Sequence, residues 1–417
     1  MMRMLRVCAA SVLWIGLLLG ATRGAAQPCT IPRLVDRGEL TGLLPGPIGP
    51  VATRAVDLNG DGLPDLLRSD PSGIAVSMNL GGGRFAPSRN VFPVFPGVDG
   101  MAIGDFNGDG HPDLVVTFDQ TIRLLAGDDA GGFTDTGPFG FFGSFTALTA
   151  GDFDGDGHLD VAWVWLVPPG GRIAVAFGDG HGNFPRITTW APRSDPLSQF
   201  SLYAAHGSHA FDFDGDGRDD LAVTSQTLSA DISLVRSRGD GTFDDPKRLG
   251  GGFRSFSSGT AVADINGDGI PDLFVLTSYE FLSRQACPFL RLPAGGTSGP
   301  DFRACDSFPF SPLAFADLTG DGRADVAYSH GGALYVGAGD GTGHFFQPHV
   351  SWPSGTSSED ILVMDVDGDG RPDIVLGPKA GEPARWWSND CPFGRSLRPA
   401  LPGPGIPPRR HGRVPGS

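Results

Sequence analysis

A nine-residue stretch of the sequence carries four aspartates, and the pattern to which it belongs occurs seven times. The stretch DFDGDGHLD begins at Asp152, and the other copies begin at Asp57, Asp105, Asp212, Asp264, Asp317 and Asp365. Successive copies start 48, 47, 60, 52, 53 and 48 residues apart. Like charges this close together repel one another, which costs free energy unless something cancels the charge. The regular recurrence indicates a repeat architecture.

The seven copies share a set of oxygen donors. Positions 1, 5 and 9 are always Asp, and position 3 is Asp, Asn or Thr. Position 7 varies too much for a common side-chain role, but every residue there has a backbone carbonyl. Positions 4 and 6 are always Gly, which a tight loop with positive φ requires, and position 2 is always apolar and should anchor the loop to a core.

Oxygens at alternating positions match the ligand preference of Ca²⁺, which takes six to eight oxygens in flexible geometry. The expected ligands are Asp57, Asn59, Asp61, Leu63, Asp65, Asp105, Asn107, Asp109, His111, Asp113, Asp152, Asp154, Asp156, His158, Asp160, Asp212, Asp214, Asp216, Arg218, Asp220, Asp264, Asn266, Asp268, Ile270, Asp272, Asp317, Thr319, Asp321, Arg323, Asp325, Asp365, Asp367, Asp369, Arg371 and Asp373.

Other occupants of these loops fit less well. An EF-hand loop opens in the same way but ends in Glu at position 12, and Mg²⁺ prefers fewer carboxylates and retained waters. Zn²⁺ would require His or Cys, and neither recurs at a ligand position. A turn without metal is the simplest alternative, yet 24 of the 47 acidic residues lie at positions 1, 3, 5 and 9. We therefore expect up to seven structural Ca²⁺ ions.

Net charge and the first residues bear on partners and location. A formal net charge of -16 argues against nucleic acid as a partner, because nucleic-acid-binding proteins carry a basic face. Residues 1–26 are typical of a cleaved secretory signal peptide, because Arg3 and Arg6 precede an apolar run that is too short to span a bilayer. No later segment is long and apolar enough to be a transmembrane segment. We expect a secreted, periplasmic or cell-surface protein.

Four cysteines follow the expected signal peptide: Cys29, Cys287, Cys305 and Cys391. An even number in an oxidising compartment favours two disulfides, and the sequence alone leaves three pairings open.

Strand patterns surround each acidic loop. A short apolar run such as TAVAD leads into the loop, a second such as DLFVLT follows it, and an alternating segment such as IAVAFG comes next. A Gly-rich turn then leads to Phe, as in GHGNF, and a fourth short segment leads to the next repeat. Four strands per repeat with few helix signals predict an all-β fold built from β-propeller blades.

The DxDGDGxxD loop and the Gly-rich turn before Phe resemble the FG-GAP or VCBS repeat family, to which the integrin α-chain propeller belongs. The resemblance covers residues 27–393. It implies a seven-bladed β-propeller with a calcium loop between the first and second strands of each blade. In that family the loops lie on one face, and ligands tend to use the opposite face.

The two ends of the propeller are expected to pair and close the ring. The seventh repeat lacks a clear fourth strand, and the segment at 33–42 has no blade of its own. We assign this segment as the outer strand of blade seven, beside the strand at 384–389, because bare sheet edges expose unpaired backbone groups. This arrangement places Cys29 near Cys391 and makes Cys287 and Cys305 partners across a hairpin in blade five.

Aromatic residues concentrate in segments that we place in connections opposite the acidic loops of blades two to four, including Trp163. The candidate ligand-binding residues are Phe141, Phe142, Trp165, Trp190, Tyr203 and His206. Clustered aromatic side chains are typical of a surface that binds sugar rings or a protein partner. The alternative is packing between blades.

Two classes of function remain. We favour a monomeric binding or adhesion module for an extracellular protein or glycan, in which Ca²⁺ stabilises the structure. The alternative is an extracellular polysaccharide lyase or hydrolase. Arg193, Tyr203 and His206 carry suitable groups, but no spacing requires catalysis and no known nucleophile motif occurs, so we assign no catalytic residue. The Pro-, Gly- and Arg-rich residues 394–417 form either a disordered tail or a basic attachment to an anionic surface.

Overall fold

The chain forms β-strands throughout the part that the computed structural model describes. The described residues are 29–41, 53–70, 72–94, 98, 100–141, 144–167, 170–191, 208–224, 232–250, 255–279, 283–289, 291–292, 296–297, 305–309, 313–347, 349–355, 360–377 and 384–391. No helix of this part is long and apolar enough to cross a membrane. The expected signal peptide at 1–26 and the tail at 394–417 lie outside it.

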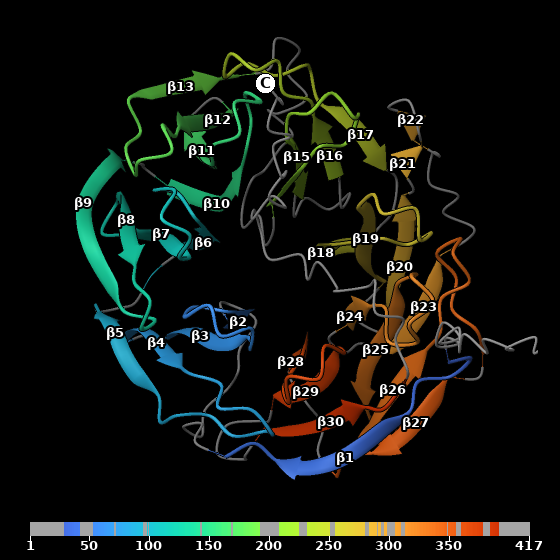
Figure 1. The fold of residues 1–417 in the computed structure, drawn as a ribbon. Coiled ribbons are helices and arrows are strands. Elements are labelled where there is room, and N and C mark those ends of the chain that lie inside the picture. Colours follow the sequence, from blue (N-terminus) through green and yellow to red (C-terminus); the bar gives the residue numbers. More distant parts are fainter. Residues whose placement is uncertain are drawn as a thin grey trace, which may run out of the picture.

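Within the described residues, the strands form seven four-stranded antiparallel sheets, arranged as the blades of a ring (Figure 1). Blade 1 comprises β2 (Thr53–Val56), β3 (Asp65–Asp70), β4 (Gly73–Ser77) and β5 (Arg89–Pro93). Blade 2 comprises β6 (Gly100–Gly104), β7 (Asp113–Phe118), β8 (Thr121–Gly127) and β9 (Phe133–Phe141). Blade 3 comprises β10 (Ser144–Gly151), β11 (Asp160–Val167), β12 (Gly170–Phe177) and β13 (Arg186–Trp190).

The remaining blades follow the same plan. Blade 4 comprises β14 (Ser208–Phe211), β15 (Asp220–Thr224), β16 (Ile232–Val235) and β17 (Lys247–Gly250). Blade 5 comprises β18 (Ser255–Ala263), β19 (Asp272–Tyr279), β20 (Ser283–Phe289) and β23 (Asp306–Pro309), with a small hairpin of β21 (Arg291–Leu292) and β22 (Gly296–Thr297). Blade 6 comprises β24 (Leu313–Ala316), β25 (Asp325–His330), β26 (Ala333–Gly337) and β27 (Val350–Pro353). Blade 7 comprises β28 (Asp360–Met364), β29 (Asp373–Gly377), β30 (Arg385–Asn389) and β1 (Leu34–Glu39).

This arrangement confirms the predicted propeller. Every acidic loop connects the first and second strands of its blade, as the loop at 57–65 does between β2 and β3. The first strands of successive blades contact one another from blade 2 to blade 7, as β10 contacts β6 and β14, and the first strands lie toward the centre of the ring (Figure 1). The fourth strands lie at the rim.

The two ends of the chain close the ring, as predicted from the unpaired segment at 33–42. Strand β1, blue in Figure 1, pairs antiparallel with β30 in red, from Leu34 opposite Asn389 to Glu39 opposite Arg385. A disulfide joins Cys29 to Cys391, whose Cα atoms are 5.9 Å apart. Cys305 is also disulfide-bonded. The side chain of Cys287, its expected partner, lies outside the description.

The hydrophobic core is divided among the joints between blades. The described buried residues form seven clusters, and each cluster combines residues of two neighbouring blades. The Phe that follows the Gly-rich turn takes part in these clusters, as Phe243 does between blades 3 and 4 and Phe345 between blades 5 and 6. Because burial of apolar surface is the main stabilising term, each blade depends on its neighbours.

Candidate metal centres

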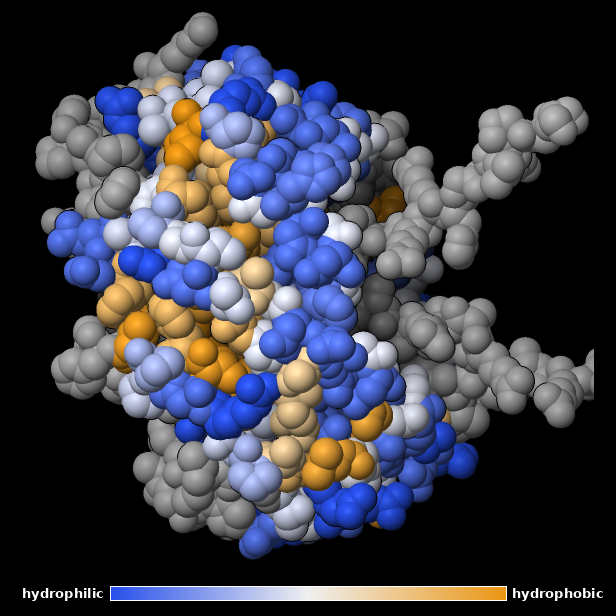
Figure 2. Space-filling model, turned by 60° about the vertical axis from the view of Figure 1, so that its left-hand side comes forward, coloured by the Kyte–Doolittle hydropathy of each residue, from blue (hydrophilic) through white to orange (hydrophobic). Residues whose placement is uncertain are grey.

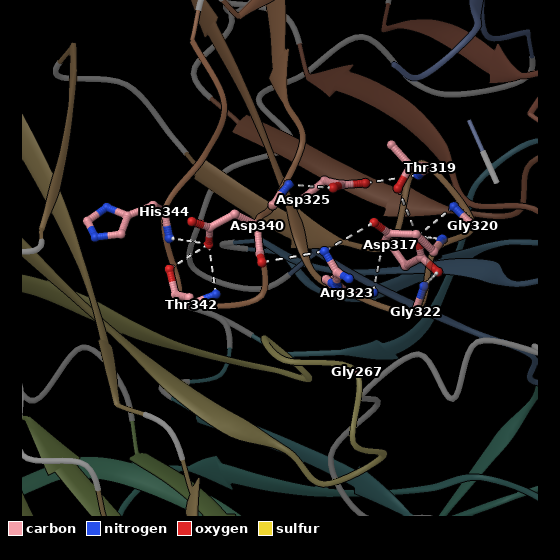
Figure 3. Close-up of polar contacts among 12 residues, drawn as sticks. Gly267, Asp317, Thr319, Gly320, Gly322, Arg323, Asp325, Asp340, Thr342 and His344 are labelled. Carbon is pink, nitrogen blue, oxygen red and sulfur yellow. Dashed lines mark hydrogen bonds and ion pairs between the residues drawn. The ribbon is translucent and has the colours of Figure 1, made fainter. Parts of the chain in front are cut away.

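The first aspartate of each loop folds the loop around its own carboxylate. In all seven loops the N–H groups of the glycines at positions 4 and 6 donate to this carboxylate, over 2.6–3.1 Å. Both glycines have φ between +75° and +91°, for example Gly60 and Gly110. A side chain would be strained at these angles, which explains the invariant glycines. Figure 3 shows Asp317 facing Gly320 and Gly322 in the loop of blade 6.

The ninth residue of each loop is a buried aspartate that ties three segments together. These seven side chains are at most 1% exposed. One oxygen accepts the N–H of position 2 over 2.7–3.3 Å, as in Asp160 with Phe153. In six loops the other oxygen accepts an N–H from the end of the third strand over 2.7–2.9 Å, as with Gly178. The aspartate therefore joins the loop to the sheet.

The loops also lie against the next blade. The apolar side chains at position 2, such as Phe153 and Leu318, are at most 2% exposed, as expected for anchors. The carbonyl of position 2 accepts a hydrogen bond from the following blade in four joints: Ser237 donates to Phe153 at 2.7 Å, and Asn389 donates to Leu318 at 2.9 Å. Asn79 likewise donates to Val366, and Gly182 donates to Phe106. Order in a loop is thereby linked to the packing of two blades.

Burial makes the loops electrostatically costly without a cation. Burial, together with the charges of neighbouring aspartates, raises the pKa of Asp160, Asp325 and Asp373 to about 8. The pKa of Asp220 rises to about 7 for the same reasons, and that of Asp65 and Asp113 to about 6. A bound cation would favour the charged forms of these carboxylates and lower their pKa.

The donor atoms fit a hard cation. In three loops, carboxylate oxygens lie within 4.8 Å of one another: those of Asp152, Asp154 and Asp160, those of Asp212, Asp214 and Asp216, and those of Asp365, Asp367 and Asp373. These are the loops with Asp at position 3. Oδ1 of Asp154 is buried and has no hydrogen-bond partner among the described residues. An unpaired buried oxygen amid carboxylates is what Ca²⁺ binding would explain, because Ca²⁺ binds oxygen ligands.

The structure adds arginines that the sequence analysis did not include as side-chain partners. Arg186 pairs with Asp154 at 3.1 Å, and Arg236 pairs with Asp214 at 2.8 Å. At position 7, where only the backbone was assigned a role, Arg218 pairs with Asp216 and Arg371 with Asp369. In blade 6, Arg323 lies 4.0 Å from Asp321 and also donates to the carbonyl of Asp340 (Figure 3). The signal was present in the sequence, because no loop with Asn at position 3 has Arg at position 7.

The aromatic residues proposed as a ligand surface are distributed differently from the expectation. Trp190 is 9% exposed and packs against Phe243 in the core between blades 3 and 4, with ring centroids 5.7 Å apart. This is the packing role that the sequence left open. Trp163 lies in strand β11 and is buried, so its placement in a connection is wrong, because β11 extends for eight residues.

Other members of that set are only partly described. Trp165 also lies within β11, so its placement in a connection is likewise wrong, and Phe141 ends β9; nothing is described of either side chain. Phe142, Tyr203 and His206 lie outside the described residues, as does Arg193 of the alternative catalytic group.

Comparison with known proteins finds a repeat family at the positions of the acidic loops. A family model described as FG-GAP-like repeat matches residues 57–116, 105–163, 212–275 and 317–376, which together exceed half of the 417-residue chain. No curated protein matches the chain in sequence.

The chain is similar to several solved structures, including two that cover most of its length. One is an Agrocybe aegerita lectin described as specifically recognising non-reducing terminal N-acetylglucosamine, with 19% identity, a TM-score of 0.56, and coverage of 81% of this chain and 85% of the lectin. The other is the WD40 domain of Toxoplasma gondii coronin, with 12% identity, a TM-score of 0.49, and coverage of 89% and 90% respectively. At such identity, the likeness to the lectin concerns the fold.

Proposed function

Because the chain belongs to the FG-GAP-like repeat family, we propose that it is an extracellular binding or adhesion module whose acidic loops hold structural Ca²⁺ and whose ligand is a carbohydrate or a protein. The observation that supports this most is the sevenfold repetition of one oxygen-rich loop at the joints of a closed ring. Repeated sites that serve every joint equally are suited to stabilising a scaffold and are unlike a single reaction centre.

In this proposal, each ion is held by the oxygens at positions 1, 3, 5 and 9 and by the carbonyl of position 7. The buried aspartate at position 9 already joins the loop to its sheet, as Asp373 does through Val366 and Asn389. A cation beside it stabilises its charged form and so stabilises the joint. Extracellular calcium modules of this kind have dissociation constants of about 10⁻⁴–10⁻³ M.

The ligand surface is proposed for the face opposite the loops. Among the described residues, the exposed large apolar side chains are scattered: Ile31, Val35, Leu80, Ile187 and Phe346. Figure 2 shows apolar residues in small groups among hydrophilic ones on the side of the ring that carries β9 and β13. Because scattered apolar residues are normal on soluble proteins, this side offers no argument for a binding surface. The lectin with a similar fold favours a carbohydrate as the first ligand class to test.

A glycan array with the calcium-loaded protein tests the proposal. We expect binding to a limited set of glycans, with loss of binding after chelation that follows loss of folding. A polysaccharide-cleavage assay on the glycans that bind separates a lectin from a lyase or hydrolase. Turnover of a bound polysaccharide would contradict the binding-module proposal.

The cleaved signal peptide at 1–26 and the monomeric state are also proposals. Cleavage of the signal peptide should leave Gln27 as the first residue of the exported protein, which N-terminal sequencing of secreted material checks. An intact Met1 on exported protein would contradict the assignment of 1–26. Size-exclusion chromatography with light scattering tests the expected monomer.

A further inference from the structure

The loops with a fourth carboxylate differ from the others in a second way. Where position 3 is Asn, its amide donates to the aspartate at position 5, over 2.9–3.1 Å, in the loops of Asn59, Asn107 and Asn266. Where position 3 is Asp, an arginine pairs with a loop carboxylate: Arg186 in blade 3, Arg218 and Arg236 in blade 4, and Arg371 in blade 7. Among the described residues, no arginine pairs with a carboxylate of the Asn-type loops at 57–65 and 105–113.

Arg186 is held in place by contacts on three sides. Its guanidinium lies 3.5 Å from the ring centroid of Phe177, donates to the carbonyl of Asp240 at 3.2 Å, and donates to Oδ2 of Asp154 at 3.1 Å. Isolated surface ion pairs contribute little because both side chains lose freedom. Here the other contacts already restrain the arginine. Its position leaves Oδ1 of Asp154, the buried oxygen without a partner, available to a cation.

Blades 2 and 3 provide a natural comparison. Their loops read DFNGDGHPD and DFDGDGHLD, so they differ only at positions 3 and 8. Arg186 pairs in the sheet with Phe177, and in blade 2 the corresponding place opposite Ala126 belongs to Thr134. The exchange of Asn for Asp in the loop therefore accompanies the exchange of Thr for Arg in the outer strand.

We propose that these arginines are built-in counter-charges for the fourth carboxylate, so that a loop with four aspartates binds Ca²⁺ no more tightly than a loop with three. This inference rests on the calcium sites of the proposed function. A guanidinium one carboxylate away from the ion offsets the attraction that the added aspartate supplies. The loop of blade 6 has an arginine without an added carboxylate, because Arg323 accompanies only three aspartates. This loop should bind Ca²⁺ most weakly.

Hydrogen exchange with mass spectrometry, titrated with Ca²⁺, tests this loop by loop in the full chain. In the wild type, the peptides covering 105–113 and 152–160 should become protected at similar calcium concentrations. Arg186→Gln should lower the midpoint for 152–160 about threefold or more, because a positive charge beside the ion is lost. The peptide covering 105–113 should not change. The double variant Asp154→Asn/Arg186→Gln recreates the blade 2 arrangement and should return the midpoint to its wild-type value.

Arg123→Gln is the matched control, because Arg123 pairs with Asp135 at 2.6 Å on strands β8 and β9, outside any acidic loop. It should leave both midpoints unchanged. An unchanged or raised midpoint for 152–160 in Arg186→Gln would overturn the proposal, since an arginine that only positions Asp154 would weaken binding when removed. Failure of the double variant to restore the midpoint would also overturn it.

A second readout separates this inference from the calcium premise. If no loop of the wild type gains protection in millimolar Ca²⁺, the calcium sites of the proposed function are wrong. The role of Arg186 as a counter-charge is then tested by measuring the melting temperatures of the variants in the presence of a chelator. Arg186→Gln should lower the melting temperature by leaving four carboxylates uncompensated, and Asp154→Asn/Arg186→Gln should recover it. Equal melting temperatures for wild type and Arg186→Gln would refute the inference.

Discussion

Asp219 and Asp152 link the acidic loops of blades 4 and 3 through two hydrogen bonds. The Asp152 N–H donates to Oδ2 of Asp219 at 2.9 Å, and the Asp219 N–H donates to the Asp152 carbonyl at 2.7 Å. Asp219 occupies position 8, where four loops have Pro, which has no N–H to donate. Burial, together with the charges of Asp152 and Asp212, raises the pKa of Asp219 to about 6. This pair of hydrogen bonds therefore places, between two loops, a carboxylate whose ionised form is disfavoured in the folded state.

Asp219→Asn should stabilise the calcium-free protein at pH 8. The pKa of Asp219 in the folded state is about 6, above the ordinary value of 3.8. At pH 8 the carboxylate is charged in both states, and its charge therefore destabilises the folded state relative to the unfolded state. An amide keeps an oxygen that can accept from Asp152 and removes the charge, for an expected gain of about 1–2 kcal/mol. Urea unfolding measures it, with exposed Asp129→Asn as the control. A loss of stability in the absence of calcium would contradict the charge argument.

The calcium-free protein should lose stability as the pH rises from about 4 to about 8. The buried aspartates Asp160, Asp325 and Asp373 have folded pKa values of about 8, above the ordinary 3.8. In this interval the folded state binds more protons than the unfolded state, so stability falls with rising pH. Calcium should remove most of this slope, because it favours the ionised carboxylates. Melting curves of metal-stripped protein at several pH values, with and without Ca²⁺, check both statements.

Opening the disulfide should weaken closure of the ring. Cys29 and Cys391 are separated by 362 residues, and the chain-entropy model assigns such a link at most about 5–6 kcal/mol. Cys29→Ser should lower the melting temperature while β1 still pairs with β30.

Peptide mapping of non-reduced protein should recover Cys29–Cys391 together with Cys287–Cys305. Recovery of a Cys29–Cys287 link would contradict this pairing.

Trp190→Ala distinguishes packing from ligand binding. The side chain is buried against Phe243, so its removal should cost about 3–5 kcal/mol by leaving a cavity between blades 3 and 4. Once a ligand is known, affinity per folded molecule should be unchanged. Unaltered stability with lost binding would instead assign Trp190 to a ligand surface.

The loop of blade 6 should be the last to order when Ca²⁺ is added. Thr319 supplies a neutral oxygen at position 3, its side chain is buried, and Arg323 adds a positive charge near Asp321. The calcium midpoint for the peptide covering 317–325 should exceed that for 57–65. An equal or lower midpoint would show that neither the exchange of the Asn amide for the Thr hydroxyl at position 3 nor the arginine lowers calcium affinity.

Much of the fold could be predicted from the repeat because local constraints recur in it. Invariant glycines require positive φ, the apolar position 2 requires a core, and the period of four short strands requires a blade. Closure was also predictable, because the segment at 33–42 had strand character and no blade. The side-chain partners were harder to predict, because Arg186 and Asp154 are 32 residues apart and meet only after the sheet has formed.

The number of loops, their candidate oxygen donors and the pairing of the two chain ends could be read from the sequence. Each of these follows from residue types at fixed spacing, which act through local backbone geometry and hydrophobic periodicity. Three contacts emerge only in the folded ring: Trp190 packs between blades, Asp219 bridges two loops, and arginines face the loops with Asp at position 3. These contacts depend on how neighbouring blades meet, and the ring must close before the blades can meet.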